Sequence, residues 1–157
     1  MGKNCFFIGH RDAPEELRPR LDEAVERHVT QYGVTEFVVG HYGRFDAMAA
    51  AAVRAVKKRH VGIALILLLP YYPFNGIREL SAEFDSSFYP PGLERVPKRF
   101  AIVRANGYMI RHSDFLICYN EGYVGSVRML MSQAVARERK GQLKIENLAE
   151  QKACHIN

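Results

Sequence analysis

Residues 5–17 read CFFIGHRDAPEEL, and this stretch decides the fold. A short apolar run ends at Gly9, and a helix start follows, with Pro14 in its first turn and two acids beside the positive end of the helix dipole. An apolar run, a glycine loop and a helix together form the unit from which parallel α/β proteins are built. We therefore expect a strand over 5–8 and a helix over about 14–32, with Asp12 as its candidate cap.

The same unit recurs along the chain. Further strands are predicted over 34–39, 61–69, 100–103, 114–119 and 143–148, and further helices over 47–58, 77–84, 105–112 and 124–140. The run from Val61 to Leu69 is apolar without alternation, which predicts burial on both faces of a parallel sheet. The predicted fold is a three-layer, Rossmann-like α/β domain with a mostly parallel sheet flanked by helices.

Length and composition indicate one folded domain. The chain has 157 residues, which suffices for one apolar core, and we expect a single domain over 1–157. Its core spans about 5–141, and 142–157 form an edge strand and a frayed tail. With 48% hydrophobic and 25% charged residues, wholesale disorder is excluded. A formal net charge of +5 weakly favours anionic partners.

Nothing in the sequence predicts a membrane partner or an oxidised compartment. The longest apolar run, Val61 to Leu69, is shorter than the roughly 20 residues that a spanning helix needs. The apolar stretch that follows the first four residues is too short for a secretory signal, so we expect a cytoplasmic protein. Cys5, Cys118 and Cys154 lack C-x-x-C spacing, which indicates reduced structural thiols.

Three predicted strand-to-helix junctions carry glycine beside polar or cationic residues. Carboxyl ends of parallel strands share one sheet edge, so we expect these loops to converge on one cleft. Glycine lets the backbone approach a phosphate, helix N-termini supply N–H donors, and arginine pairs with anions through its planar fork. A phosphorylated ligand is therefore predicted, although glycines that only make tight turns remain the alternative. The candidate ligand-binding residues are Gly9, His10, Arg11, Gly40, Gly43, Arg44, Asp46, Asn120, Gly122, Gly125, Ser126 and Arg128.

The remaining polar residues of these loops leave the chemistry open. Neither G-x-G-x-x-G nor a P-loop occurs, so no nicotinamide cofactor or ATP hydrolysis is predicted. His10 and His41 could meet as bases or metal ligands, but no third ligand has suitable spacing, and no metal is predicted. Glu121 is the best candidate catalytic carboxylate, or else a solvated loop acid. Asp46 either orients a ligand hydroxyl or caps the second helix.

The order of these motifs resembles the SLOG superfamily of Rossmann-like proteins, which includes the DNA-processing proteins and the lonely-guy phosphoribohydrolases. The chain is most similar to its YpsA-like branch, in Ile8-Gly9-His10-Arg11, in Gly43-Arg44-Phe45-Asp46 before an alanine-rich helix, and in Arg104-x-Asn106-x-x-Met109. The similarity covers about Cys5 to Gly141. The resemblance implies a nucleotide or nucleotide derivative bound at the carboxyl edge of the sheet, with Arg104 and Asn106 approaching the same cleft.

The last loop departs from the pattern of that superfamily. Lonely-guy enzymes carry P-G-G-x-G-T followed by a catalytic glutamate, whereas here 121–126 read EGYVGS and lead into Arg128. Only Glu121 could supply the acid, so the leading prediction is a nucleotide-binding protein with no reaction assigned.

Alternatives to this reading remain open. The first is a nucleoside 5′-monophosphate N-glycosidase that uses Glu121. The second is DNA-processing-related single-strand binding, which the modest charge disfavours, so nucleic acid is not the expected partner. A homodimer or higher oligomer formed through the alanine-rich helix over 47–58 also stays open, and we treat 71–98 as a crossover with a functional flap.

Overall fold

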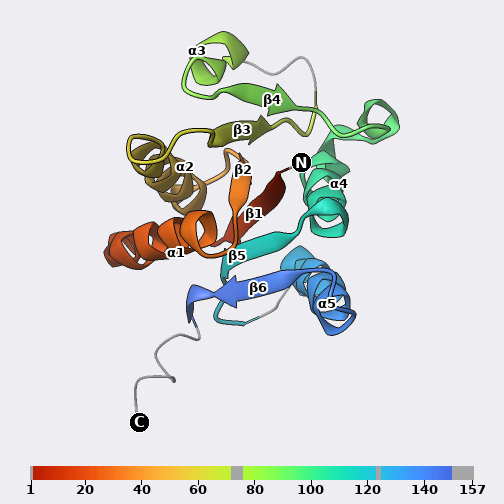
Figure 1. Ribbon diagram of the computed structural model, residues 1–157. Coiled ribbons are helices and arrows are strands. Elements are labelled where there is room, and N and C mark those ends of the chain that lie inside the picture. Colours follow the sequence, from red (N-terminus) through yellow and green to blue (C-terminus); the bar gives the residue numbers. More distant parts are fainter. Residues whose placement is uncertain (1, 72–75, 123–124, 150–157) are drawn as a thin grey trace.

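The computed structural model describes residues 2–71, 76–122 and 125–149. Residues 150–157 of the predicted tail, with Cys154, and residues 72–75 of the predicted flap lie outside these ranges. The described residues form one six-stranded sheet with the order β4-β3-β2-β1-β5-β6, in which every neighbouring pair is parallel (Figure 1). The sheet is thus parallel throughout, as expected for a Rossmann-like α/β fold.

Strands and helices alternate along the chain. The strands are β1 (Lys3–Gly9), β2 (Val34–Val39), β3 (Ala64–Leu68), β4 (Ser86–Phe88), β5 (Phe115–Tyr119) and β6 (Lys144–Asn147). The α-helices are α1 (Arg18–Thr30), α2 (Arg44–Lys57), α3 (Ile77–Ser81), α4 (Lys98–His112) and α5 (Gly125–Arg139), and the short 3₁₀ helices are η1 (Glu15–Leu17) and η2 (Leu93–Arg95). No helix among the described residues is long and apolar enough to cross a membrane.

Helices cover both faces of the sheet and bury two apolar clusters. Helices α1 and α2 lie on one face, and α4 and α5 lie on the other (Figure 1). The chain moves outward from β1 to β4, then crosses back through α4 to β5 on the opposite side of β1. The strand order therefore reverses between β1 and β5, and such a switch point is where open α/β sheets bind ligands.

The central strands are buried on both faces. Residues Cys5 to Ile8 of β1 and all of β5 are buried, because β1 pairs with β2 on one side and with β5 on the other. Such strands read as continuous apolar runs, which is why the sequence predicts β1 and β5 closely. Cys5 and Cys118 are buried within this sheet and form no disulfide with each other.

The predicted strand over 100–103 is wrong, because these residues lie inside α4. Locally the run has the aromatic and β-branched residues of a strand, but Ala101, Ala105 and Met109 recur at helical spacing and are buried against the sheet. The missed strand, β4, is an edge strand whose sequence Ser-Ser-Phe carries almost no apolar signal.

Two local predictions also need correction. Asp12 does not cap the first helix, because η1 begins after Pro14, and no side chain bonds to the first turn of η1 or of α1. Strand β3 begins at Ala64 instead of 61, because Gly62 adopts φ +83° in a turn and leaves Val61 fully exposed.

Arg137 fixes α5 against the end of α4. Its Nη1 donates hydrogen bonds to the carbonyl oxygens of Ile110 (2.7 Å) and Ser113 (2.8 Å), and its Nη2 donates to Gln142 (3.1 Å). Carbonyls at a helix C-terminus have no partner within the helix, so a cation there both satisfies them and complements the helix dipole. One side chain therefore ties α4, α5 and the turn before β6 together.

His28 is a fully buried polar residue of α1. Its Nδ1 lies 2.7 Å from the carbonyl oxygen of Ala24, so in the neutral ring Nδ1 carries the proton and Nε2 has no partner among the described residues. Tyr32 and Phe115 meet the ring edge to face at 5.0 and 5.4 Å. Burial lowers the pKa of His28, with the hydrogen bond from Nδ1 to Ala24 opposing it.

We expect His28 to make the protein sensitive to acid. The unfolded chain takes up a proton near the ordinary histidine pKa of about 6.5, while the folded protein resists it, so stability is full above that pH and falls as the pH drops below it. His28→Phe keeps a ring in place and removes the titration. Urea unfolding from about pH 7.5 to about pH 5, on either side of the ordinary histidine pKa, should therefore show a shallower loss of stability for His28→Phe than for wild type. His112→Phe, at an exposed histidine, should keep the wild-type slope, and equal slopes in all three proteins would contradict this role.

Candidate functional site

The candidate site lies where β2, β1 and β5 end. These strands are adjacent in the sheet and parallel, so their carboxyl ends meet at one edge around the switch point between β1 and β5. The loops that leave this edge are the predicted ligand-binding segments, of which residues 123–124 lie outside the described ranges. The contacts between these loops, described next, therefore decide how closely the three loops converge.

The first two loops touch directly through glycine. Gly43 has φ +151°, and a Cβ atom there would lie 2.6 Å from the Cα atom of Arg11. The backbone N–H of Arg44 also donates a hydrogen bond of 2.8 Å to the carbonyl oxygen of Arg11. Only glycine allows both the dihedral angle and this close approach. The contact holds Arg11 beside the N-terminus of α2.

Gly9 has an equally close neighbour. A Cβ atom at Gly9 would lie 2.2 Å from Cγ of Phe45, whose ring is buried in the first turn of α2. Phe45 also packs against Phe7, with ring centroids 6.4 Å apart. Because glycine has no side chain, α2 packs closely against the end of β1 at Gly9.

Asp46 shapes the second loop from inside. Its Oδ2 accepts a 3.0 Å hydrogen bond from the backbone N–H of Tyr42, and it lies 3.1 Å from the position of a Cβ atom at Gly40. Burial raises the pKa of Asp46 to about 6, and the hydrogen bond from Tyr42 opposes that shift. Asp46 therefore holds the loop ahead of the helix and does not bond to the N-cap residue, Gly43.

An aromatic contact links the loop after β3 to this region. Burial, and then the nearby Tyr71 and Asp46, raise the pKa of Tyr42. Tyr71 follows β3, so a third connection at the same edge lies beside the loop after β2. Tyr71 was only one of several aromatic residues in the predicted flap, and its sequence position alone does not identify this contact.

The third loop joins the site through the end of β5. The ring of His10 meets the ring of Tyr119 edge on, with centroids 5.7 Å apart. The Tyr119 hydroxyl donates a 3.2 Å hydrogen bond to the exposed Glu121 carboxylate. Burial and the neighbouring carboxylate raise the pKa of Tyr119. Tyr119 thus contacts both His10 and Glu121. The sequence analysis did not identify Tyr119 as a site residue.

Asn120 carries a buried donor that has no partner among the described residues. Its backbone N–H donates to Oδ1 of Asn147 (3.2 Å), and Nδ2 of Asn147 donates to its carbonyl oxygen (3.1 Å), so the backbone is fixed against β6. The side chain is only 4% exposed, yet its Nδ2 has no acceptor among the described residues. A buried donor left unpaired costs about 1–3 kcal/mol, and a ligand oxygen would remove that cost.

Two arginines predicted to bind phosphate flank these loops. Arg11 and Arg44 are both exposed, and Nη1 of Arg44 donates a 3.1 Å hydrogen bond to the carbonyl oxygen of Ala13. Arg44 therefore uses one of its donors to fasten the first loop. Its remaining donors, with those of Arg11, stand beside the N-terminus of α2.

Other predicted site residues lie on α4 and α5. Arg104 lines a groove between these helices together with Gly125, and Asn106 is partly buried on α4. Arg128 lines a separate hollow of α5 with Met131 and Arg139. Ser126 lies in the first turn of α5, and its side chain lies outside the described part of the chain. Gly122 and Gly125 are exposed on either side of residues 123–124.

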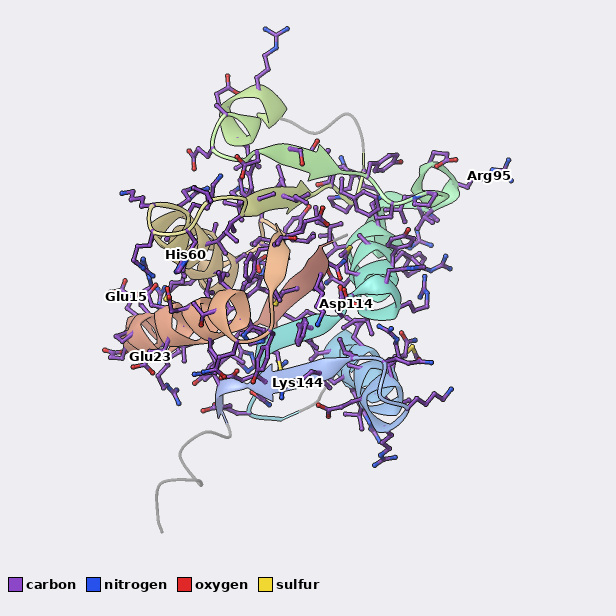
Figure 2. The ribbon with its side chains drawn as sticks, viewed as in Figure 1. Glu15, Glu23, His60, Arg95, Asp114 and Lys144 are labelled. Atoms are coloured by element: carbon purple, nitrogen blue, oxygen red, sulfur yellow. The ribbon has the colours of Figure 1, made fainter. Side chains whose placement is uncertain are left out.

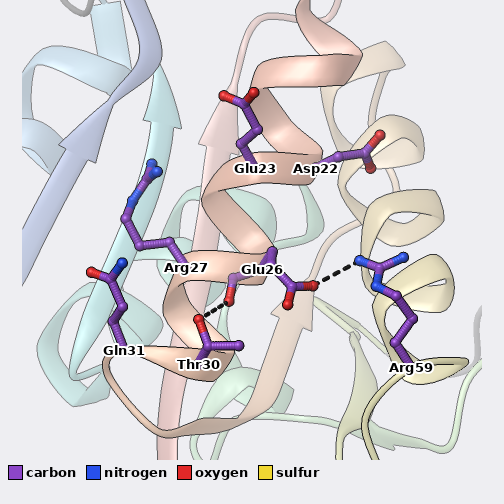
Figure 3. Close-up of a pocket in the computed structure, with 7 residues that line it drawn as sticks. All are labelled: Asp22, Glu23, Glu26, Arg27, Thr30, Gln31 and Arg59. Atoms are coloured by element: carbon purple, nitrogen blue, oxygen red, sulfur yellow. Dashed lines mark hydrogen bonds and ion pairs between the residues drawn. The ribbon is translucent and has the colours of Figure 1, made fainter.

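No group of three or more His, Cys, Asp or Glu side chains suited to a metal ion occurs in the part of the chain that the structure describes. His10 packs on Tyr119, and His41 lies 6.5 Å from the ring of Tyr42. A hollow of about 500 Å³ between α1 and α2 is polar, but Figure 3 shows that Glu26 in it already meets Arg59. Hydrogen bonds from Arg59 and His60 lower the pKa of Glu26, so its charge is neutralised within the protein.

Comparison with known proteins gives little beyond the fold. No family model and no curated protein matches the chain. Among solved structures, the Moco carrier protein of Chlamydomonas rheinhardtii is similar, with 9% identity and a TM-score of 0.43 over 98% of this chain and 96% of that one. Likeness at this level assigns no function, and membership of the SLOG superfamily stays a prediction.

We expect Asp46 to lower stability as the pH rises. A carboxyl group whose pKa is raised to about 6 binds its proton more tightly in the folded protein than in the unfolded chain. Its contribution is therefore fully present at acid pH and is lost as the pH rises through about 6. Asp46→Asn keeps an oxygen for the Tyr42 N–H, so in urea titrations its stability should gain on wild type as the pH rises from about 5 to about 8, through the folded-state pKa of about 6.

The exposed Asp12→Asn, which also removes one negative charge, is the control and should follow wild type. A difference between Asp46→Asn and wild type that stays constant over the same interval would exclude a buried, titrating Asp46.

Proposed function

We propose that the chain binds a nucleotide or a phosphorylated nucleotide derivative at the carboxyl edge of β2, β1 and β5. One observation carries the proposal: Gly43 of the loop after β2 touches Arg11 of the loop after β1, and His10 touches Tyr119 at the end of β5. These contacts surround the switch point, where the buried side-chain amide of Asn120 has no acceptor among the described residues. Loops that only reversed the chain direction would need neither contact. The resemblance to the SLOG superfamily supports the same ligand class.

An anion is the favoured guest because several weak donors converge. One helix N-terminus contributes about 0.3–1 kcal/mol and one charge-assisted hydrogen bond about 1.5–3 kcal/mol, whereas micromolar binding needs about 8 kcal/mol. The N-terminus of α2, Arg11, Arg44 and the Asn120 amide supply these donors from separate segments. Phe45 and Arg11 fill the space beside Gly9 and Gly43, so the backbone that is open to a phosphate lies at Gly122 and Gly125, where no atom comes within 4 Å of a Cβ position.

The polar residues around the anion suit a sugar and a base. Asp46 is the candidate acceptor for a ribose hydroxyl, since its carboxylate lies partly buried between Gly40 and Tyr42. The rings of His10 and Tyr119 form an aromatic surface at the same edge. We also place the protein in the cytoplasm, because its cysteines are predicted to be reduced structural thiols.

Arg11→Ala should weaken binding of the phosphorylated ligand. Losing one charge-assisted contact costs about 1.5–3 kcal/mol, which is roughly a 10- to 150-fold loss of affinity. Thermal-shift measurements with AMP, ADP-ribose and nicotinamide dinucleotide should show stabilisation of wild type by at least one of them, reduced in Arg11→Ala. Arg95→Ala, at an exposed arginine on η2 far from these loops, should behave like wild type.

If a ligand stabilised Arg11→Ala as much as wild type, the ligand would bind elsewhere than at this edge of the sheet. The absence of any shift with all three compounds would count against nucleotide binding itself.

A glycosidase is the second candidate, because the Tyr119 hydroxyl orients the Glu121 carboxylate at the mouth of the same site. Beside a bound nucleoside monophosphate this carboxylate would act as a general base: water attacks C1′ of the ribose as the N-glycosidic bond breaks, Glu121 takes the proton of the water, and that proton passes to the departing base. Incubation with the four common monophosphates should then release free base, detectable by chromatography, and Glu121→Gln should abolish the release. Release that persists in Glu121→Gln, or none from wild type, excludes this activity for Glu121.

A further inference from the structure

A groove of about 650 Å³ runs between α4 and α5 on the face of the sheet away from α1 and α2. Its walls carry Phe100, Val103 and Met129, which are 48%, 37% and 67% exposed. These are three of the four large apolar side chains that are exposed among the described residues. Grouped exposed apolar residues mark binding surfaces more often than scattered ones do.

The groove is built on rigid parts. Arg137 holds the end of α4 to α5 through the carbonyls of Ile110 and Ser113. At Gly107 the helices come close, since a Cβ atom there would lie 3.8 Å from Leu130 and 3.3 Å from the guanidinium of Arg111. The floor is therefore formed by a glycine and Leu130, and the space above it is already shaped before anything binds.

The charges around the groove are all of one sign. Arg104 and Arg111 line it, and the Arg99 guanidinium lies 4.7 Å from the centroid of the Phe100 ring. Helix α4 contains no Asp or Glu, and the first acid of α5 is Glu138, whose carboxylate accepts a hydrogen bond from the backbone of Ile145. A partner that fills this groove must bring negative charge with its apolar side chains.

We infer that the groove between α4 and α5 docks an acidic amphipathic helix of a partner protein. The lining residues of α4, from Phe100 to Arg111, span about 16 Å, the length of about 11 helical residues. A helix lies in such a groove through apolar residues spaced three and four apart. This length and apolar lining match three turns of helix.

The spacing of the two arginines sets the sequence pattern of the partner. Arg104 and Arg111 lie seven residues apart on α4, which places their Cα atoms about 10 Å apart along one face. A helix laid along α4 meets both with carboxylates that are also seven residues apart. The expected pattern is E-x-x-L-L-x-x-E, in which the leucines contact Val103 and Met129.

A second copy of this chain is the less suitable occupant. A two-fold contact through this face would bring Arg104 and Arg111 of one copy against the same residues of the other, with no acid in the groove lining to separate them. Like charges placed together in an interface cost affinity, so the cationic groove selects against its own copy.

The test uses the full-length protein and a fluorescein-labelled helical peptide of about 12 residues that carries E-x-x-L-L-x-x-E and is stapled on its outer face. A matched peptide has lysine at both glutamate positions. Fluorescence anisotropy should show that wild type prefers the glutamate peptide by about tenfold or more. The double variant Arg104→Glu/Arg111→Glu should reverse that preference, because both arginines are exposed and the charge swap leaves the core intact.

Arg95→Glu/Arg139→Glu is the matched control, since it makes the same charge change at exposed residues outside the groove, one of which points away from the body of the protein in Figure 2. It should keep the wild-type preference. No binding of the glutamate peptide, equal binding of both peptides, or a dimer seen by light scattering that Met129→Glu dissociates would each overturn the proposal.

Discussion

The parallel alignment of β1 with both β2 and β5 is the constraint on which the rest of the structure depends. Parallel strands cannot be joined by a tight hairpin, so each connection must cross a face of the sheet, and here helices make most of those crossings. The two ladders of β1 lead to helices on opposite faces. Because every strand ends at the same edge, loops far apart in sequence meet there without any specific attraction between them.

That geometry also explains where the tight contacts fall. Gly9 and Gly43 are the two positions where a side chain would collide with Phe45 or with the backbone of Arg11. Both collisions occur where α2 begins against the end of β1, and no such crowding surrounds Gly122 or Gly125. The first two loops are therefore fixed by packing, whereas the third is fixed by polar contacts of Asn120 and Tyr119.

How well the sequence predicted each part follows the same division. Strand β2 was predicted residue for residue, because Val34 and Phe37 to Val39 are buried apolar residues and Gly40 closes the run. The run over 100–103 was misread as a strand, since four residues cannot distinguish a buried helix from a strand. Strand β4 was missed because its stability comes from pairing with β3, which its sequence does not encode.

For the candidate site, the sequence locates the loops at the sheet edge as segments and gives none of their atomic contacts. Glycine followed by a cationic or polar residue marks the loops correctly, because both the turn and the helix start leave a local pattern. The buried side-chain amide of Asn120 leaves no such pattern. Its position depends on Asn147, which lies 27 positions further along the chain and whose side chain bonds to the backbone of Asn120. Arg104 has a sequence pattern, but the pattern points elsewhere. The resemblance to the SLOG superfamily predicts Arg104 near the loops, whereas in the structure Arg104 lines the groove between α4 and α5.

The distribution of charge separates the two faces of the protein more sharply than the net charge of +5 suggests. On the α1 and α2 face, cations and acids meet in pairs, such as Arg59 with Glu26 and Arg18 with Asp22. On the α4 and α5 face, Arg104 and Arg111 stand over apolar side chains with no acid beside them in the groove. Arg104 and Arg111 are about 10 Å apart along α4, beyond the Debye length of about 8 Å in physiological salt, so each one attracts an anionic group largely on its own.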